Sequence, residues 1–250
     1  FANTSIYGGV SKEFNISLVG SKIQISDLIT NREGTDQLYN IQKIQFNDFT
    51  LDTTMLTKTA SLSSTQIVDL VELYIASFNR APDSVGLYYW GSRLSDGMSL
   101  IDIAQSFFDQ PETIAAYPSN MPTTDFVTKV YNNVLGRGPD TPGLNYWIGE
   151  LTNGHITKNS FLLAIINGAR ASSGSAIDRQ TLANKELVGA HYAIYQGLDN
   201  STNWAKDVMS GVSDQLSTVT SANAKADFYA IMAANPLTSD LIVKLVGIAV

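Results

Sequence analysis

The stretch Asn79–Trp90, with the sequence NRAPDSVGLYYW, decides the fold because it occurs twice in the chain. It returns as Gly136–Trp147, GRGPDTPGLNYW, at an offset of 57 residues (137 − 80). Arg, Pro, Asp, Gly, Tyr and Trp all keep their places in the second copy. A motif that repeats in register inside matching helical patterns predicts tandem supersecondary units rather than one catalytic centre.

Each copy has the sequence signals of three helices. In the first copy, the apolar residues before the loop follow the spacing of one helical face: Ile67, Leu70, Val71, Tyr74 and Phe78. Pro82 disfavours helical geometry at Ala81, so this helix should end near Asn79, and Asp83 is placed to cap the next helix. The predicted unit is therefore a helix, an Arg-x-Pro-Asp loop, a second helix, a glycine turn and a third helix.

A third copy is present in weaker form. The same offset leads from Trp147 to Trp204, but the positions of the loop Arg and Asp are occupied by Ile194 and Gly197. The third unit is therefore expected to pack its helices without the Arg-x-Pro-Asp loop.

The N-terminal residues predict strands instead of helices. Phe14–Val19, Ile23–Leu28 and Ile41–Phe46 have the length and the apolar pattern of strands. Between them, Gly34–Tyr39 matches the second half of the Gly-Gly-x-Gly-x-Asp-x-apolar-x repeat that forms calcium-binding parallel β-rolls. We interpret this region as the terminal cap of a β-roll whose body lies outside the chain.

The expected fold is mainly α, with tandem three-helix repeats after a small, β-roll cap-like N-terminal β segment. Packing between neighbouring repeats would make the array rod-like or curved. The last residues, Ser239–Val250, are predicted to be either an export signal or a final amphipathic helix. The predicted divisions are 1–60 for the β segment, 61–118 and 119–175 for the first two repeats, and 176–250 for a degenerate third repeat with a secretion-signal-like tail.

The duplicated loop and the segment before it resemble known secreted proteins. The GRxPDxxGxxYW-type unit resembles a helical repeat of unknown function that recurs in very large secreted bacterial proteins, often after calcium-binding arrays of the RTX (repeats-in-toxin) type. The resemblance covers residues 65–170 well. It implies type I secretion and an extracellular or cell-surface location, as in a surface layer (S-layer) or an adhesin. It implies no chemistry for the loop residues.

Calcium is the cofactor that such a resemblance implies, and the candidate ligands are Asn31, Glu33, Asp36 and Asp48. Calcium takes six to eight oxygen ligands, and a β-roll binds it between successive turns. One half-repeat supplies too few ligands alone, so the favoured interpretation is that these residues form turns and solvated strand edges.

The loop residues also allow two interpretations. In the structural one, Arg80 and Arg137 brace their loops, Asp83 and Asp140 cap helices, and the tryptophans anchor the core. In the functional one, the arginines bind sulfate, phosphate or glycan carboxylates while the aromatic rings stack on sugars. The structural interpretation is favoured because the same loop carries a packing glycine and a tryptophan, Trp90 in the first copy and Trp147 in the second.

Composition excludes several classes of function. The chain carries 23 acidic and 16 basic residues, a net charge of −7, and it has no Lys/Arg cluster that could replace phosphate counterions, so nucleic-acid binding is not expected. The absence of cysteine excludes disulfides and thiol chemistry. No apolar stretch approaches the roughly 18 residues that would span a bilayer. No catalytic motif is present, and His155 and His191 are predicted to be a turn residue and a helix residue.

The sequence thus predicts a non-enzymatic C-terminal module of a secreted bacterial surface protein, serving assembly or attachment and type I export. Its expected partners are further copies of itself or a cell-surface glycan. Two alternatives stay open, a glycan-binding module and an accessory region of a secreted hydrolase.

Overall fold

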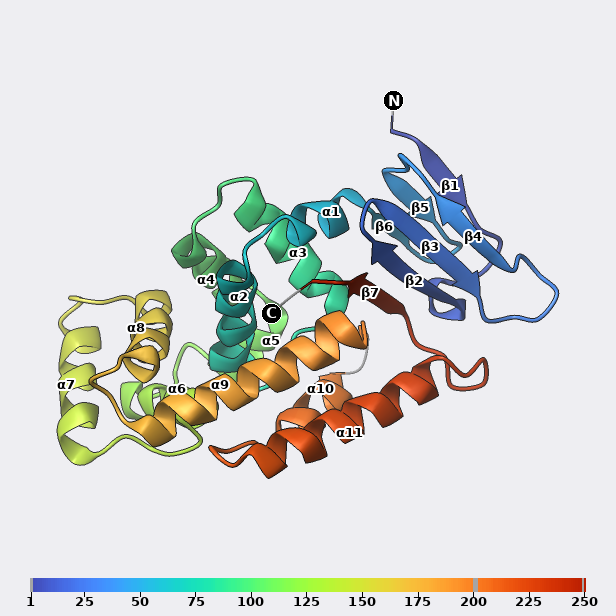
Figure 1. Ribbon diagram of the computed structural model, residues 1–250. Helices are drawn as coiled ribbons and strands as arrows, with labels where there is room; N and C mark the ends of the chain where they lie inside the picture. The colour runs from blue at the N-terminus through green and yellow to red at the C-terminus, as the bar shows by residue number, and fades with distance from the viewer. Residues whose placement is uncertain (1, 200–201, 249) are drawn as a thin grey trace.

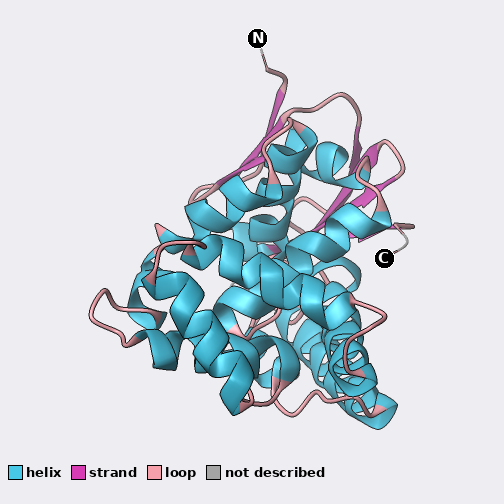
Figure 2. Ribbon diagram, turned by 90° about the vertical axis from the view of Figure 1, so that its left-hand side faces the viewer, coloured by secondary structure: helices cyan, strands magenta, loops and turns pink. Residues whose placement is uncertain are grey.

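The computed structural model describes residues 2–199, 202–248 and 250. It is mainly helical, as predicted, with the strands gathered at one end of the molecule (Figures 1 and 2). The N-terminal elements are β1 (Thr4–Ile6), the short 3-10 helix η1 (Ser11–Glu13), β2 (Phe14–Val19), β3 (Lys22–Asp27), β4 (Thr35–Leu38), β5 (Lys43–Gln45), β6 (Thr50–Asp52) and the helix α1 (Thr54–Ala60).

The N-terminal strands form two small sheets that are mostly antiparallel. β2, β3 and β4 pair in antiparallel order, and β5 and β6 do the same, whereas β1 lies parallel to β5. A two-residue turn at Gly20-Ser21 joins β2 to β3, and so short a connection can only join antiparallel strands. The small β segment is therefore present, and most of its pairing differs from the parallel pairing of β-roll turns. The helix α1 at its end has no counterpart in the predicted 1–60 segment.

The tail of the chain forms a strand, where the sequence suggested an amphipathic helix. β7 (Ile242–Val246) pairs in parallel with β2 at the edge of the four-stranded sheet, which has the order β4-β3-β2-β7. Its side chains are largely buried, because β2 offers an unpaired edge and the helices offer an apolar face. The second strand of the chain and the last one are thereby joined in one sheet (Figure 1).

The helices follow the predicted order in three units. In units 1 and 2, the first helix ends in a left-handed residue, Asn79 with φ 51° and Gly136 with φ 69°. Unit 1 contains α2 (Ser64–Phe78), α3 (Ser84–Ser95), α4 (Leu100–Phe108) and the short α5 (Pro111–Ala116). Unit 2 contains α6 (Thr123–Leu135), α7 (Thr141–Thr152) and α8 (Lys158–Arg170). Unit 3 contains α9 (Ala176–Ala190), the π-helix η2 (His191–Tyr195), α10 (Thr202–Met209) and α11 (Leu216–Ala233).

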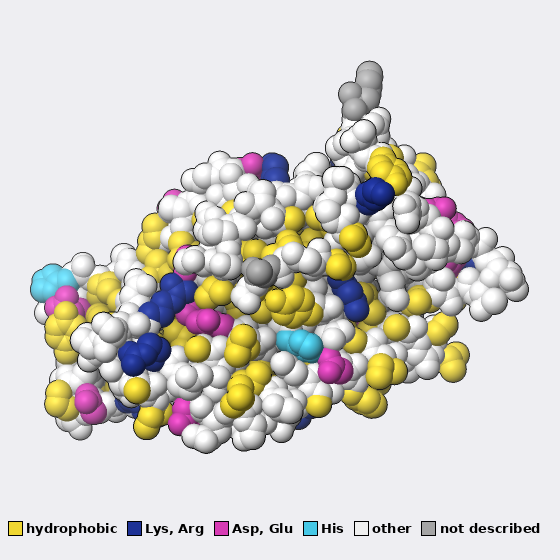
Figure 3. All heavy atoms as spheres, viewed as in Figure 1, with side chains coloured by type: hydrophobic (Ala, Val, Ile, Leu, Met, Phe, Trp, Pro, Cys, Tyr) yellow, Lys and Arg dark blue, Asp and Glu magenta, His cyan; other side chains and the backbone are white. Residues whose placement is uncertain are grey.

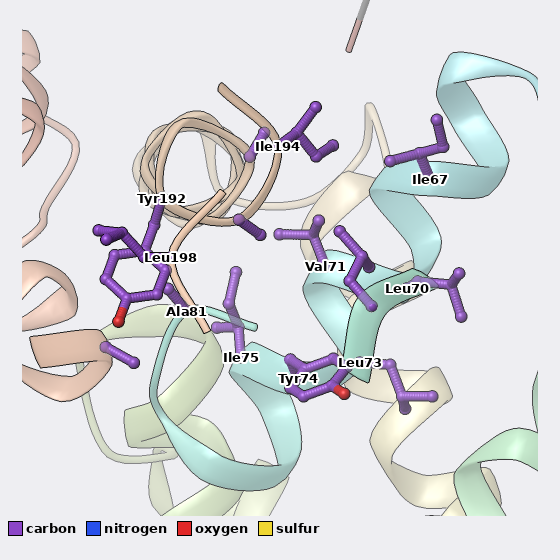
Figure 4. Close-up of a cluster of buried hydrophobic side chains, with 14 of the residues drawn as sticks. Ile67, Leu70, Val71, Leu73, Tyr74, Ile75, Ala81, Tyr192, Ile194 and Leu198 are labelled. Atoms are coloured by element: carbon purple, nitrogen blue, oxygen red, sulfur yellow. The ribbon is translucent and has the colours of Figure 1, made fainter. Parts of the chain in front are cut away.

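The units pack around α2 rather than in a row. α2 contacts α6 and α8 of unit 2 and also α9 of unit 3. Figure 4 shows its side chains meeting those of η2, with Val71 and Ile75 near Tyr192 and Ile194. A helix that is apolar on nearly every side must be surrounded, and Ile67 through Ala76 of α2 are almost all buried. The expected rod-like or curved array is therefore replaced by a closed cluster of units.

Within the described part of the chain, none of the helices combines the length and the apolar character needed to cross a membrane.

Candidate functional site

The two Arg-x-Pro-Asp loops end in the same helix cap. Asp83 is the N-cap of α3 and accepts a hydrogen bond from the amide of Gly86 at 3.0 Å. Asp140 is the N-cap of α7 and accepts from the amide of Gly143 at 2.7 Å. The spacing of the motif is thus explained, because the cap residue reaches the third amide of the helix.

The glycine of the motif leaves room for that cap. A Cβ atom on Gly86 would lie 2.0 Å from Oδ2 of Asp83 and 2.6 Å from the hydroxyl of Tyr74. On Gly143 it would lie 2.8 Å from Oδ1 of Asp140. Any side chain at these positions would push the capping carboxylate away from the helix amide.

Arg80 joins its loop to another helix of unit 1. Its guanidinium makes a bidentate contact with Glu112 in the first turn of α5, with Nε donating to Oε1 at 3.0 Å and Nη2 donating to Oε2 at 2.9 Å. The third nitrogen donates to the carbonyl of Ala81 and lies 3.0 Å from Asp83. Burial opposes the charge, but the bonds to Glu112 and the charge of Asp83 outweigh it and raise the pKa of Arg80. The predicted contact within the loop exists, and the stronger partner lies outside it.

Arg137 repeats this arrangement across a unit boundary. Its Nε and Nη2 donate to the two carboxylate oxygens of Asp178 at 2.8 and 2.6 Å, and Nη1 donates to the carbonyl of Gly138. Asp178 lies in the first turn of α9, so this contact fastens unit 2 to unit 3. The hydrogen bonds to Asp178 raise the pKa of Arg137. The Arg137 side chain is 48% exposed, compared with 8% for Arg80.

Each tryptophan packs on the third helix of its own unit. Trp90 contacts Phe107 of α4 with ring centroids 5.2 Å apart, and Trp147 contacts Phe161 of α8 at 5.1 Å. Trp204 stacks on Tyr229 of α11 at 4.7 Å. All three are partly buried against the core. Unit 3 therefore keeps the aromatic contact although it has lost the Arg-x-Pro-Asp loop.

A cavity of about 270 Å³ lies beside the first loop, between α2, α3 and α5, and Arg80, Asp83 and Trp90 are among its lining residues. Its charged side chains are already paired, because Glu112 and Asp83 hold Arg80, and the amide of Gly86 binds Asp83. These groups line the cavity, and the hydrogen bonds and ion pairs between them fasten the surrounding helices to one another.

Three of the four candidate calcium ligands contact one short stretch of the N-terminal segment, Tyr7–Ser11. Glu33 accepts a hydrogen bond from the amide of Gly8, Asp36 from the hydroxyl of Tyr7, and Asp48 from the amide and hydroxyl of Ser11. Asn31 has a left-handed backbone with φ 62° in the turn before β4. In the described residues no three His, Cys, Asp or Glu side chains gather as a metal site. These hydrogen bonds fasten the turns that carry Glu33, Asp36 and Asp48 to the same stretch of chain, Tyr7–Ser11.

The two histidines contact carboxylates on the surface. Nδ1 of His155 lies 3.2 Å from Glu150, and Nε2 of His191 lies 2.6 Å from Asp227, which also accepts from Gln196. A general base needs a positioned nucleophile or a substrate proton within reach. The polar contacts of the two imidazole rings are with carboxylates and with one side-chain amide.

Sequence reasoning missed the groups that connect the units. Arg170 of α8 donates to Asp69 at 2.6 Å and to the fully buried Glu72 at 2.8 Å, both on α2. Lys185 of α9 is buried and donates to the carbonyl of Asn133 on α6. A signal for Glu72 existed, because a charged residue between Val71 and Leu73 interrupts an apolar helix and requires a buried partner.

Residues 104–171 match the sequence model of a family described as a domain of unknown function, DUF4214. The matched part runs from α4 to the residue after α8, so it contains the Arg137 loop and begins after the Arg80 loop. No curated protein and no solved structure matches the chain. The family description names no activity, so the match transfers no chemical role to any residue.

Proposed function

We propose that the chain is a non-catalytic module of a secreted bacterial protein, located at the cell surface or in the extracellular matrix, where it serves assembly or attachment of the S-layer or adhesin type. The observation that carries the proposal is that both Arg-x-Pro-Asp loops connect helices to one another. Each loop arginine forms an ion pair that connects helices, Arg80 with Glu112 and Arg137 with Asp178. Such contacts are expected in a module that must keep a fixed shape.

The surface of unit 3 offers a contact for assembly. On the face drawn in Figure 3, apolar side chains are visible over the region of α11. Phe228 and Ile231 on this helix are 58% and 71% exposed, and Leu237 just beyond it is 92% exposed. Exposed apolar side chains that lie close together favour contact with another protein surface.

Sedimentation of the full chain over a wide concentration range, with and without calcium, tests the assembly proposal. We expect larger species to form as concentration rises, and Ile231→Glu to weaken them. Ile114→Glu, which changes an exposed residue on α5, is the matched control. A chain that stays monomeric at high concentration in both conditions would contradict self-assembly.

The proposed role in type I export requires that the tail be accessible before the protein folds. In the folded protein β7 is paired with β2, so an export signal there would be readable only before folding. Fusing residues 176–250 to a passenger and measuring its secretion through a type I system tests this. The passenger is expected to be exported when it folds slowly and retained when it folds fast.

One specific observation favours the alternative of a glycan-binding module. Where the three units meet, the structure has a groove that is lined by lysine residues, which is described below. An accessory region of a secreted hydrolase would be equally inert by itself.

A further inference from the structure

A large hollow lies where the three helical units meet. It has a volume of about 1010 Å³ and is lined by the end of α2, by α5 and α6, and by α9, α10 and the residues after α10. This volume is at the upper end of the range of small-molecule sites. Because every unit contributes to it, the groove exists only in the assembled fold.

Three lysines line this groove in a protein of net charge −7. Lys185 is 3% exposed, and its Nζ donates to the carbonyl of Asn133 at 2.5 Å. Nζ of Lys129 donates to the carbonyl of Ala116 at 2.8 Å and lies over the ring of Tyr117. The ammonium groups of Lys185 and Lys129 thus contact neutral groups, whereas Nζ of Lys206 lies 4.0 Å from the carboxylate of Glu112.

The two carboxylates in the groove lining are held by cations or hydroxyls of their own. Glu112 is bound by Arg80, and Asp207 is bound by Lys225 at 3.1 Å and by the hydroxyl of Tyr229 at 2.9 Å. Among the described residues no carboxylate forms an ion pair with the buried Lys185, an arrangement that costs free energy. Its burial lowers its pKa to about 8.

The rest of the lining is suited to a ligand with hydroxyl groups. Ser77 is 1% exposed, and its hydroxyl is buried without a hydrogen-bond partner. Asn132, Asn133, Ser210 and Ser213 also line the groove, and the side-chain amides of the two asparagines donate to Thr128, Ala76 and Tyr117. A buried hydroxyl without a partner is unfavourable, and a ligand that supplies the missing hydrogen bond gains affinity.

We propose that this groove binds an acidic saccharide, with a carboxylate of the ligand beside Lys185 and Lys129 and its ring hydroxyls along Ser77 and the asparagine amides. The binding of an anion rests on the groove itself. The choice of a saccharide rests on the proposed function at a cell surface, where attachment requires a glycan partner.

Binding should be accompanied by proton uptake. A carboxylate beside Lys185 favours the ammonium form and raises its pKa, so the complex holds more protons than the free protein near pH 8. The other charged groups lining the groove are Lys129, Lys206, Glu112 and Asp207. A merely structural Lys185 would give no such uptake.

Calorimetric titration of the full chain with a trisaccharide of uronic acids tests the site, in two buffers of different ionisation enthalpy at pH 8. We expect binding with proton uptake, weakened about tenfold or more by Lys185→Met and Lys129→Met. Lys22→Met on β3 is the matched control and should bind like the wild type. Ser77→Ala removes a hydroxyl without removing charge and keeps the test available if Lys185→Met does not fold. This substitution should weaken the binding of the saccharide and leave the binding of inorganic sulfate unchanged.

The outcomes separate this site from the assembly proposal. A neutral trisaccharide that binds as well as the uronate would overturn the anion site, as would uronate binding that survives both lysine substitutions. Inorganic sulfate that binds as tightly as the uronate would overturn the saccharide assignment. A chain that stays monomeric yet binds uronate through Lys185 supports the groove while it contradicts self-assembly.

Discussion

At the scale of single residues, the two copies of the motif are expected to contribute differently to the stability of the protein. Arg80 and Arg137 occupy matching positions, and each makes a bidentate contact with a carboxylate in the first turn of another helix. The surroundings differ, because Arg80 is enclosed by Tyr74 and Phe78 while Arg137 is half exposed. The acids differ in the opposite sense, because the Asp178 side chain is 9% exposed and the Glu112 side chain is 30% exposed. A pair that loses its arginine leaves an uncompensated carboxylate, and the cost is larger where that carboxylate is buried.

Substitution of the two arginines should therefore give unequal losses. We expect Arg137→Gln, which leaves the buried Asp178 unpaired, to lower the free energy of unfolding by about 3 kcal/mol, and Arg80→Gln, which leaves the more exposed Glu112, by about 1–2 kcal/mol. Urea denaturation of both variants measures the difference, with the second serving as control for the first. Equal losses would show that burial of the carboxylate does not set the strength of these contacts.

The motif glycine permits a second test at this scale. Gly86→Ala would bring a methyl group against the carboxylate of Asp83 and should destabilise the protein by about 1–3 kcal/mol. Gly168→Ala in α8 is the matched control, because nothing lies within 4 Å of its added Cβ. That control should stabilise the protein by about 0.5–1 kcal/mol through better helix propensity. Thermal unfolding of both variants checks the opposite signs.

At the scale of elements, β7 connects the sheet to the helices. Val243 is fully buried, its amide donates to the carbonyl of Gly197, and its carbonyl lies 2.8 Å from the hydroxyl of Tyr88. A Cβ on Gly197 would lie 2.6 Å from the backbone of Val243, so this contact requires glycine on unit 3. One strand thus touches β2, α3 of unit 1 and the end of η2.

A polar residue in this strand should loosen the whole assembly. Val243→Ser is expected to cost about 2–4 kcal/mol of unfolding free energy, because it removes buried methyl groups and buries a hydroxyl. Val246→Ser at the end of the same strand, where the side chain is 48% exposed, should cost less than about 0.5 kcal/mol. Chemical denaturation measures both variants. A small loss at Val243 would mean that β7 is only loosely attached.

The elements predictable from the sequence are those whose signals are local. The helices around both loops and the caps at Asp83 and Asp140 follow from apolar spacing and turn chemistry within a few residues. The strand at Ile242–Val246 could not be assigned, because a five-residue segment with four apolar residues around Lys244 fits a helix equally well until its partner β2 is known. The same limit applies to the candidate site, since Glu112 and Asp178 lie far along the chain from the arginines they bind.

At the scale of the whole molecule, a buried charge cluster links stability to pH. Burial, followed by the neighbouring carboxylate of Glu186, raises the pKa of Glu72 to about 10, although Arg170 opposes the change. The folded state then binds a proton more readily than the unfolded state, whose Glu has its usual value of 4.5. This group's contribution is fully present below that value and is lost as pH rises toward 10.

Glu72→Gln should remove this dependence. We expect the stability difference to shift in favour of the variant by up to about 4 kcal/mol between pH 5 and pH 8, since the wild type loses about 1.4 kcal/mol per pH unit in this range and the amide needs no proton. The measured quantity is the difference in unfolding free energy between the two proteins at each pH, in which the other titrating groups cancel. A difference that stays constant with pH would contradict the assigned protonation.

The closed arrangement of the units also predicts how the chain unfolds. A row of repeats would unfold from its ends, because each unit would contact only its neighbours. Here α2 contacts units 2 and 3, and β7 returns from the end of the chain to β2, so no unit can open without exposing the core of another. The protein should therefore unfold in one cooperative transition.

The tryptophans make this testable, because Trp90, Trp147 and Trp204 report on units 1, 2 and 3 in turn. Three variants that each keep one tryptophan and change the other two to Phe isolate the signals. Within each variant, the urea midpoint from fluorescence should coincide with that from far-ultraviolet circular dichroism, which follows all the helices together. If the Trp204 signal instead changes at lower urea than the helical signal, unit 3 detaches first, and the pairing of β7 with β2 is too weak to close the molecule.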